Sequence, residues 1–263
     1  MQTSNDIERR VAAARELARG LEGQEGVVGA FLHGSSIRPY GDDASDLDIA
    51  LVVEDGSLPA AAAAGAHQKL WEEGRRVADL SWYARSVFVT PHADQERFRA
   101  THARVLFDRG GALATLLSVL SELPPAVAAE RMRVHYFEVT SLAAKILSAQ
   151  RRARADAVQL LAAQLVLCSG KLLTLSRSAW PAPTTWMFEE LVLVGVPDHL
   201  VGGLRRVLES PQARELRSLR GALDEYLLGA GATFVGDPAA LLDWIYGTQE
   251  GLRAVASWGL ATG

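Results

Sequence analysis

Hydrophobic and polar positions follow two different periods along the 263-residue chain, and the period changes near residue 112. Before that point, short apolar runs predict strands over 27–32, 47–53, 77–83 and 104–107, because strand side chains alternate between two faces. Apolar residues at helical spacing predict helices over 6–21 and 58–75, the second of them rich in alanine.

Beyond residue 112 the strand signals stop and the apolar period becomes helical. Proline-containing breaks separate helices predicted over 112–121, 125–153, 155–178, 185–194, 199–208, 212–229 and 238–257. The pattern predicts an α+β protein. Residues 1–111 would form a first domain with a mixed sheet and helices, and residues 112–263 an α-helical bundle.

Composition narrows the class of protein. The chain is 49% hydrophobic and 22% charged, which is ordinary for a soluble globular protein. A single cysteine, Cys168, excludes a disulfide framework and favours a reducing, cytoplasmic compartment. The N-terminal residues show no apolar stretch typical of a signal peptide, and the longest apolar run, 158–168, is about half of the roughly 20 residues that a membrane span needs.

The balance of charged residues limits the kinds of molecule that the protein is expected to bind. The chain has 27 basic and 31 acidic residues, a balance that disfavours sequence-independent binding of long nucleic acid and permits cationic small substrates. Other catalytic classes lack their signatures. There is no Gly-x-Ser-x-Gly turn, no Gly-x-x-x-x-Gly-Lys loop and no zinc-ligand spacing among the histidines.

The first candidate site is a small turn followed by two aspartates. Gly34 and Ser35 form a turn after one predicted strand, and Asp46 and Asp48 lie at the start of the next. Because strand residues two apart share a face, the two carboxylates point the same way while Leu47 points into a core. Their mutual repulsion is relieved by Mg²⁺, and the turn offers N–H groups and a hydroxyl to phosphate. The sequence therefore predicts a metal–triphosphate site.

A third aspartate extends this site. In the predicted strand 77–83, Leu80 and Trp82 share one face and Asp79 lies on the other. A carboxylate from a neighbouring strand would complete a cage for two metal ions and could accept the proton of an attacking hydroxyl.

These residues resemble the signature of the polymerase-β-like nucleotidyltransferases: Gly34-Ser35, then Ser45-Asp46-Leu47-Asp48, then Asp79 on a later strand. The helical part resembles bacterial aminoglycoside and lincosamide nucleotidyltransferases. The resemblance implies transfer of a nucleoside monophosphate, AMP from ATP in the first instance, to a small-molecule hydroxyl with release of pyrophosphate. It places Gly34, Ser35 and Ser45 at the nucleotide, Asp46, Asp48 and Asp79 at two Mg²⁺ ions, and Asp79 at the acceptor proton.

The helical part holds further candidates. Lys145 and Lys171 are two of only three lysines, and either could reach a triphosphate, although long lysine side chains commonly extend to solvent instead. Glu138 is the second candidate for the general base, after Asp79. Trp180, Trp186 and Glu189 are candidates for an aromatic and acidic wall that binds the acceptor; the alternative is that the tryptophans pack in the core.

Two other functions stay open at the level of sequence. The acceptor could be a tRNA end or a protein side chain instead of a small molecule, although the chain lacks a basic stripe for tRNA. The chain could also bind nucleotide without catalysis. In each case it would act as a monomer or homodimer.

Overall fold

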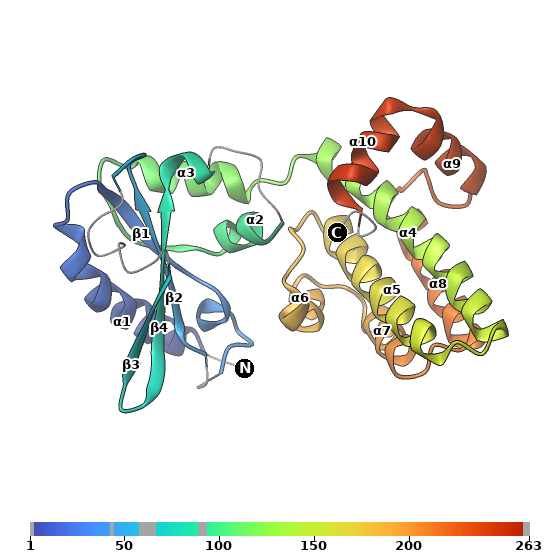
Figure 1. The fold of residues 1–263 in the computed structure, drawn as a ribbon, viewed down its shortest axis with the longest axis horizontal. Coiled ribbons are helices and arrows are strands. Elements are labelled where there is room, and N and C mark those ends of the chain that lie inside the picture. Colours follow the sequence, from blue (N-terminus) through green and yellow to red (C-terminus); the bar gives the residue numbers. More distant parts are fainter. Residues whose placement is uncertain (1–2, 43–44, 58–66, 89–93, 260–263) are drawn as a thin grey trace. The chain divides into compact units, whose positions relative to one another are not determined.

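The computed structural model describes residues 3–42, 45–57, 67–88 and 94–259, and the chain forms two compact units, Met1–Glu122 and Leu123–Gly263 (Figure 1). The first unit combines helices with a five-stranded mixed sheet, and the described part of the second is helical. The predicted α+β organisation is confirmed.

The sheet of the first unit has the strand order β3-β4-β2-β1-β5. Strands β2 and β4 run parallel, and the other neighbouring pairs run antiparallel. The strands are β1 (Val27–His33), β2 (Leu47–Val53), β3 (His67–Glu72), β4 (Arg75–Ala84) and β5 (Arg104–Asp108). This order puts the parallel pair at the centre of the sheet, which is where the aspartates lie.

The two faces of the sheet differ in what covers them. Helix α1 (Ser4–Glu22) packs on a face that includes Ile49, Leu51, Leu80 and Trp82. Helices α2 (Asp94–Thr101) and α3 (Ala112–Ser121) pack on the other face, which includes Ala50, Val52 and Phe31 (Figure 1). The predicted alternation is therefore confirmed, since Leu80 and Trp82 lie on the α1 face and Asp79 on the opposite one.

One predicted helix is wrong where the structure describes it. Residues 67–72, the end of the helix predicted over 58–75, form strand β3, which pairs with β4 in a hairpin; residues 58–66 lie outside the described residues. The hairpin loop consists of Glu73 and Gly74, both with positive φ (48° and 79°), the backbone that a two-residue turn between antiparallel strands requires. Lys69, which the sequence placed on a helix, thus lies on a strand.

Helix α3 belongs with the sheet, so the first unit ends after residue 122 and not after residue 111. Leu113, Leu117 and Leu120 of α3 are buried in the layer beneath β1 and β2. The backbone N–H groups of Leu113 and Ala114 donate to the two carboxylate oxygens of Asp108, at 3.1 and 2.9 Å. A side chain at the end of β5 therefore caps the start of α3.

The second unit is built around two long paired helices, α4 (Pro125–Arg151) and α5 (Ala155–Ser176). Shorter helices complete it: α6 (Met187–Leu193), α7 (Asp198–Glu209), α8 (Ala213–Gly229), α9 (Pro238–Gly247) and α10 (Gln249–Trp258). Helix α5 is long and apolar enough to cross a membrane, but 61% of its most apolar window is buried, as expected of the central helix of a bundle.

The helix predicted over 238–257 is two helices. Thr248 has an extended backbone and its hydroxyl accepts from the N–H of Gly251 at 2.9 Å, which caps the start of α10. A Cβ on Gly251 would collide with the backbone of Trp244 and Ile245, so the glycine permits α10 to fold back closely against α9.

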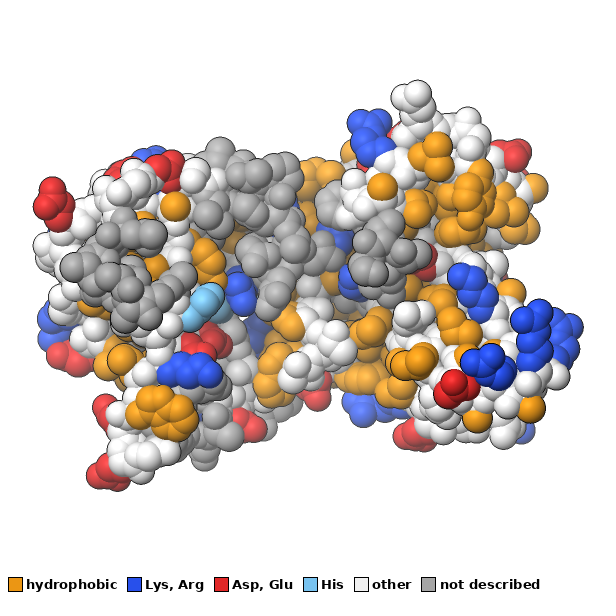
Figure 2. All heavy atoms as spheres, viewed as in Figure 1, with side chains coloured by type: hydrophobic (Ala, Val, Ile, Leu, Met, Phe, Trp, Pro, Cys, Tyr) orange, Lys and Arg blue, Asp and Glu red, His pale blue; other side chains and the backbone are white. Residues whose placement is uncertain are grey.

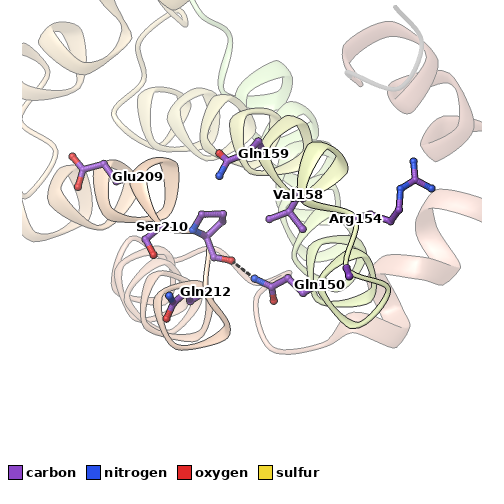
Figure 3. A pocket seen from close by; sticks show the side chains of 10 residues that line it. Gln150, Arg154, Val158, Gln159, Glu209, Ser210 and Gln212 are labelled. Carbon is purple, nitrogen blue, oxygen red and sulfur yellow. Dashed lines mark hydrogen bonds between the residues drawn. The ribbon is translucent and has the colours of Figure 1, made fainter.

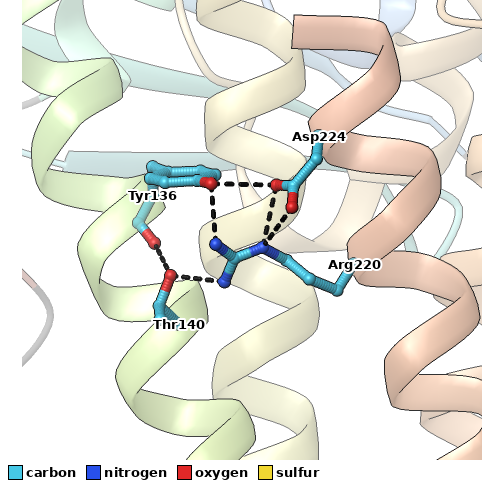
Figure 4. Close-up of polar contacts among 4 residues, drawn as sticks. All are labelled: Tyr136, Thr140, Arg220 and Asp224. Atoms are coloured by element: carbon cyan, nitrogen blue, oxygen red, sulfur yellow. Dashed lines mark hydrogen bonds and ion pairs between the residues drawn. The ribbon is translucent and has the colours of Figure 1, made fainter. Parts of the chain in front are cut away.

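A polar network joins α4 to α8 (Figure 4). The Tyr136 hydroxyl donates to Asp224 at 2.9 Å and accepts from Arg220 at 2.6 Å, and Arg220 also donates to the hydroxyl of Thr140. Asp224 in turn accepts from Nε of Arg220 at 2.8 Å. Because each member supplies a partner to another, these polar groups are satisfied in a partly buried position.

Candidate functional site

Three aspartates meet on the sheet face that α1 does not cover. Asp46 precedes β2, Asp48 lies on β2, and Asp79 lies opposite Asp48 on the parallel strand β4. A carboxylate oxygen from each lies within 4.8 Å of the other two, and all three residues are half-buried. The structure thus brings together the three carboxylates that the sequence selected.

The turn after β1 lies directly against this cluster. Gly34 has a φ of +83°, and Ser35 begins the short 3₁₀ turn η1 (Ser35–Ile37). A Cβ on Gly34 would lie 3.0 Å from Cγ of Asp48 and would collide with its Oδ2. Glycine is needed here twice over, for its backbone angle and for the close approach of the turn to the carboxylate.

Two serines tie the turn to the segment that carries the aspartates. The Ser35 hydroxyl donates to Oγ of Ser45 at 3.1 Å, and Ser45 donates to Oδ1 of Asp42 at 3.1 Å. Arg10 of α1 holds the same segment by donating to the carbonyl oxygen of Ser45 at 3.0 Å. Gly34, Ser35 and Ser45, the three predicted nucleotide-binding residues of the first unit, are therefore grouped beside the carboxylates.

The donor set fits a hard divalent cation. Three carboxylates from adjacent strands offer only oxygen ligands, which Mg²⁺ prefers, and three negative charges this close repel one another without a cation. His33, opposite Asp48 on β1, does not supply that charge. Burial and, to a smaller extent, Arg99 lower the pKa of its imidazole to about 3, so His33 is neutral near pH 7.

Two arginines of the first unit lie in places that the sequence did not indicate. Arg38 is 2% exposed, and its guanidinium lies 4.5 Å from the ring centroid of Phe98 on α2. Arg99, also on α2, donates to the hydroxyl of Tyr83 at 3.2 Å. The positions of both arginines could not be predicted, because both depend on helix α2, which was not predicted.

Glu138, the second candidate base, is engaged in the core of the helical unit. It is 8% exposed and accepts hydrogen bonds at Oε2 from the ring Nδ1 of His135 at 2.9 Å and from the thiol of Cys168 at 3.3 Å. Burial lowers the pKa of His135 despite the opposing effect of Glu138. Burial raises the pKa of Cys168, so its thiol is protonated and unreactive. The role of Glu138 as a base stays a prediction.

The two predicted phosphate lysines differ in their surroundings. Lys145 is exposed on α4, whereas Lys171 on α5 is half-buried and close enough to His135 and Cys168 to lower the pKa of both. Their role toward a triphosphate stays a prediction.

The predicted acceptor wall does not form as one surface. Trp180 is only 2% exposed, and its ring lies 5.3 Å from the guanidinium carbon of Arg131, so it is a packing residue. Trp186 is half-buried, and Glu189 is exposed while its neighbour Glu190 is buried. An amphipathic helix turns adjacent residues in different directions, and this separates the acidic pair.

The described cavities of the helical unit also lie elsewhere. One, of about 520 Å³, is lined by residues such as Gln150, Arg154 and Gln212 where the turns α4–α5 and α7–α8 meet (Figure 3). Basic side chains gather over the same α4–α5 turn (Figure 2), where Arg151 and Arg154 are exposed. This cavity is about 18 Å along α4 from Glu138, at 1.5 Å per residue. Among the described residues, neither Trp180 nor Trp186 lines it.

Comparisons with known proteins find no match in sequence: neither a family model nor a curated protein matches the chain. Among solved structures, it is similar to a nucleotidyltransferase-like protein from Exiguobacterium sibiricum 255-15. The identity is 13%, the alignment covers 96% of this chain and 91% of that chain, and the TM-score is 0.48.

Proposed function

We propose that the protein is a Mg²⁺-dependent nucleotidyltransferase that moves a nucleoside monophosphate, AMP from ATP, onto a hydroxyl group of a small molecule in the cytoplasm. The observation that carries the proposal is the cluster of Asp46, Asp48 and Asp79 in contact with the positive-φ turn at Gly34. Aminoglycosides and lincosamides are the acceptor classes that the sequence resemblance suggests.

Each group has a task in that reaction. Asp46, Asp48 and Asp79 would hold Mg²⁺, which neutralises charge on the triphosphate and on the reacting oxygens. The N–H groups of the turn and the hydroxyls of Ser35 and Ser45 bind and orient the β- and γ-phosphates. Neutral His33 adds no positive charge that would compete for the carboxylates.

The step itself is an in-line displacement. The acceptor oxygen forms a bond to the α-phosphorus while the bond from that phosphorus to the α–β bridging oxygen breaks, and pyrophosphate leaves. The proton of the acceptor hydroxyl passes to a carboxylate. Asp79 is our choice for that base, because it lies within the cluster, and Glu138 is the second candidate.

Substitution of the aspartates tests the proposal. Asp46→Asn and Asp48→Asn should each lower Mg²⁺-dependent pyrophosphate release at least about 100-fold, since each removes a charged ligand from the transition state. Binding of Mn²⁺, followed by its electron paramagnetic resonance signal, should weaken in the same variants. Glu8→Gln, at an exposed carboxylate of α1 on the other side of the sheet, is the matched control.

The acceptor is identified by incubating the protein with Mg²⁺, each of four labelled nucleotides, and an aminoglycoside, a lincosamide or bulk tRNA. Label on a small molecule supports the proposal, and label on tRNA or on the protein redirects it to a macromolecular acceptor. Near-normal turnover in either Asp46→Asn or Asp48→Asn would contradict the metal assignment.

A further inference from the structure

The edge strand β3 continues the row of residues that forms the candidate site. Lys69 on β3 lies opposite Asp79 on β4, Asp79 lies opposite Asp48 on β2, and Asp48 lies opposite His33 on β1. Directly opposite residues in a sheet share a face, with Cβ atoms about 5 Å apart. A single row therefore crosses the sheet from Lys69 through two carboxylates to the turn at Gly34, the residue after His33.

The side chains of β3 divide between the two faces as this register requires. Nδ1 of His67 lies 2.8 Å from Oγ of Ser81, which is two residues from Asp79 on β4, so His67 is on the carboxylate face. Leu70 packs into the core beneath α1, on the opposite face. The pairing shifts between Leu70, opposite Ala78, and Trp71, opposite Arg76, and the extra residue belongs to β4. Alternation along β3 is therefore uninterrupted and puts Lys69 and Trp71 on the same face as His67; both are exposed, Trp71 to 61%.

If the proposed function is correct, the geometry of the reaction indicates from which side of the row the acceptor approaches. In an in-line displacement, the attacking and leaving oxygens lie on opposite sides of the phosphorus. Pyrophosphate is held at the Gly34–Ser35 turn, at the β1 end of the row, so the acceptor must approach from the β4 and β3 end. We propose that the carboxylate face of β3 is part of the acceptor subsite, with Trp71 stacking on a ring of the acceptor and Lys69 binding an anionic substituent.

This assignment selects a class of substrate. An exposed tryptophan face stacks on sugar or other planar rings, and an ammonium group attracts phosphate or carboxylate. The acceptor would then be a ring-bearing hydroxyl compound with a negative charge, such as a phosphorylated sugar, and this replaces the cationic aminoglycosides that the sequence resemblance suggests. A polycationic aminoglycoside would place like charge against Lys69, which costs affinity.

Three probes that differ in charge test the charge preference: glucose 6-phosphate, glucose and glucosamine. Binding to the full-length protein is measured by calorimetry with Mg²⁺ and a non-hydrolysable ATP analogue, and kcat/KM for AMP transfer is measured with ATP. Wild-type protein should favour glucose 6-phosphate over glucosamine by about tenfold or more, and Lys69→Glu should abolish or invert this preference. Arg15→Glu, the same charge reversal on exposed α1 across the sheet, should leave it unchanged.

The aromatic part has its own pair of variants. Trp71→Ala should weaken binding of all three probes about tenfold, and Trp71→Phe should restore much of it. Tyr246→Ala, at an equally exposed ring on α9, should have no effect. Affinity for Mg²⁺ and for the ATP analogue should be the same in wild type, Arg15→Glu and the Trp71 and Tyr246 variants, which excludes general damage to the fold. Lys69→Glu places a negative charge opposite Asp79, so its fold is checked by circular dichroism instead.

The outcomes separate the two proposals. Unchanged charge preference in Lys69→Glu, preference of the wild type for glucosamine, or no binding of any probe at about 10 mM would overturn the acceptor subsite while leaving nucleotidyl transfer intact. Absence of Mg²⁺-dependent pyrophosphate release from wild-type protein would overturn the proposed function, and with it the subsite as one for an acceptor.

Discussion

Gly34 is the residue at which backbone geometry and chemistry depend on each other most directly. Its positive φ disfavours any side chain, and its missing Cβ is what allows the turn to touch Asp48. Gly56 has nearly the same φ, +81°, but a Cβ there would meet no atom within 4 Å. Gly56 therefore shows a positive φ in open space, and Gly34 a positive φ together with a close contact.

Gly34→Ala should destabilise the first unit by more than Gly56→Ala does. Both changes force alanine to a positive φ, which costs about 1 kcal/mol or more. At Gly34 the ψ of −165° lies in a region essentially restricted to glycine, and the collision with the carboxylate adds to that cost. We expect a difference of at least about 1 kcal/mol in the free energy of unfolding, measured with denaturant. Equal losses in the two variants would show that the turn can move away from Asp48.

His135 predicts a pH dependence for the helical unit. Burial lowers the pKa of its imidazole below the ordinary value of 6.5, so between the two values the unfolded chain binds a proton that the folded chain does not. The contribution of neutral His135 to the free energy of unfolding should therefore be fully present above pH 6.5. It should fall as the pH decreases below 6.5, by up to about 1.4 kcal/mol per pH unit.

The matched variants are His135→Gln and His199→Gln, the latter at an exposed residue of α7. Denaturant unfolding at pH 7.5 and pH 5.5 should show a smaller loss for His135→Gln than for wild-type protein. The loss for His199→Gln should equal that of the wild type. A parallel slope in His135→Gln would mean that another group is responsible.

At the scale of elements, the β3–β4 hairpin shows what limited prediction from sequence. The strands β1, β2 and β5 and the long helices followed from apolar period alone, because each is long or bounded by clear turn residues. Strand β3 did not, since His67, Lys69 and Trp71 are polar or exposed and follow an alanine-rich segment. The residue that indicates the hairpin is Gly74, which is typical of a turn and directly precedes the alternating residues of β4. With β3 misassigned, the position of Lys69 opposite Asp79 could not be predicted.

The hairpin turn can be improved in a predictable direction. Glu73 holds a φ of +48°, which asparagine adopts at less cost than glutamate. Glu73→Asn should raise the free energy of unfolding by about 0.5–1 kcal/mol, and the neighbouring change Glu72→Asn, on the extended strand, should not. A loss of stability in Glu73→Asn would contradict the two-residue turn.

At the scale of the whole molecule, the boundary between the two units follows the packing of the helices and not the point at which the apolar period changes. The helical pattern begins at residue 112, but α3 completes the core of the sheet, and Asp108 caps its first turn. Sequence period identifies where an element type changes; it does not report which neighbour the element packs against. Asp46, Asp48 and Asp79 could be grouped because strand alternation fixes the face on which each lies. Trp180 was predicted at a surface but is buried, because its packing neighbours do not follow from the period.

Two fragments test that division. Residues 1–122 should fold cooperatively, whereas residues 1–111 should not, because the shorter fragment exposes the apolar layer that Leu113, Leu117 and Leu120 cover. Each buried leucine contributes about 2 kcal/mol, a large share of the stability of a small unit. Circular dichroism during thermal unfolding distinguishes the two. A cooperative transition in residues 1–111 would place the boundary before α3.

The pairing of β2 with β4 has a further consequence. Asp48 pairs with Asp79 and Ile49 with Leu80, on opposite faces of the same two strands. If β4 slipped by one residue, Asp79 would turn into the apolar layer and Leu80 onto the carboxylates. A cation held by all three aspartates would therefore stabilise the correct strand register selectively. It would bind only correctly registered chains and, at 100 times its dissociation constant, favour them by about 2.7 kcal/mol.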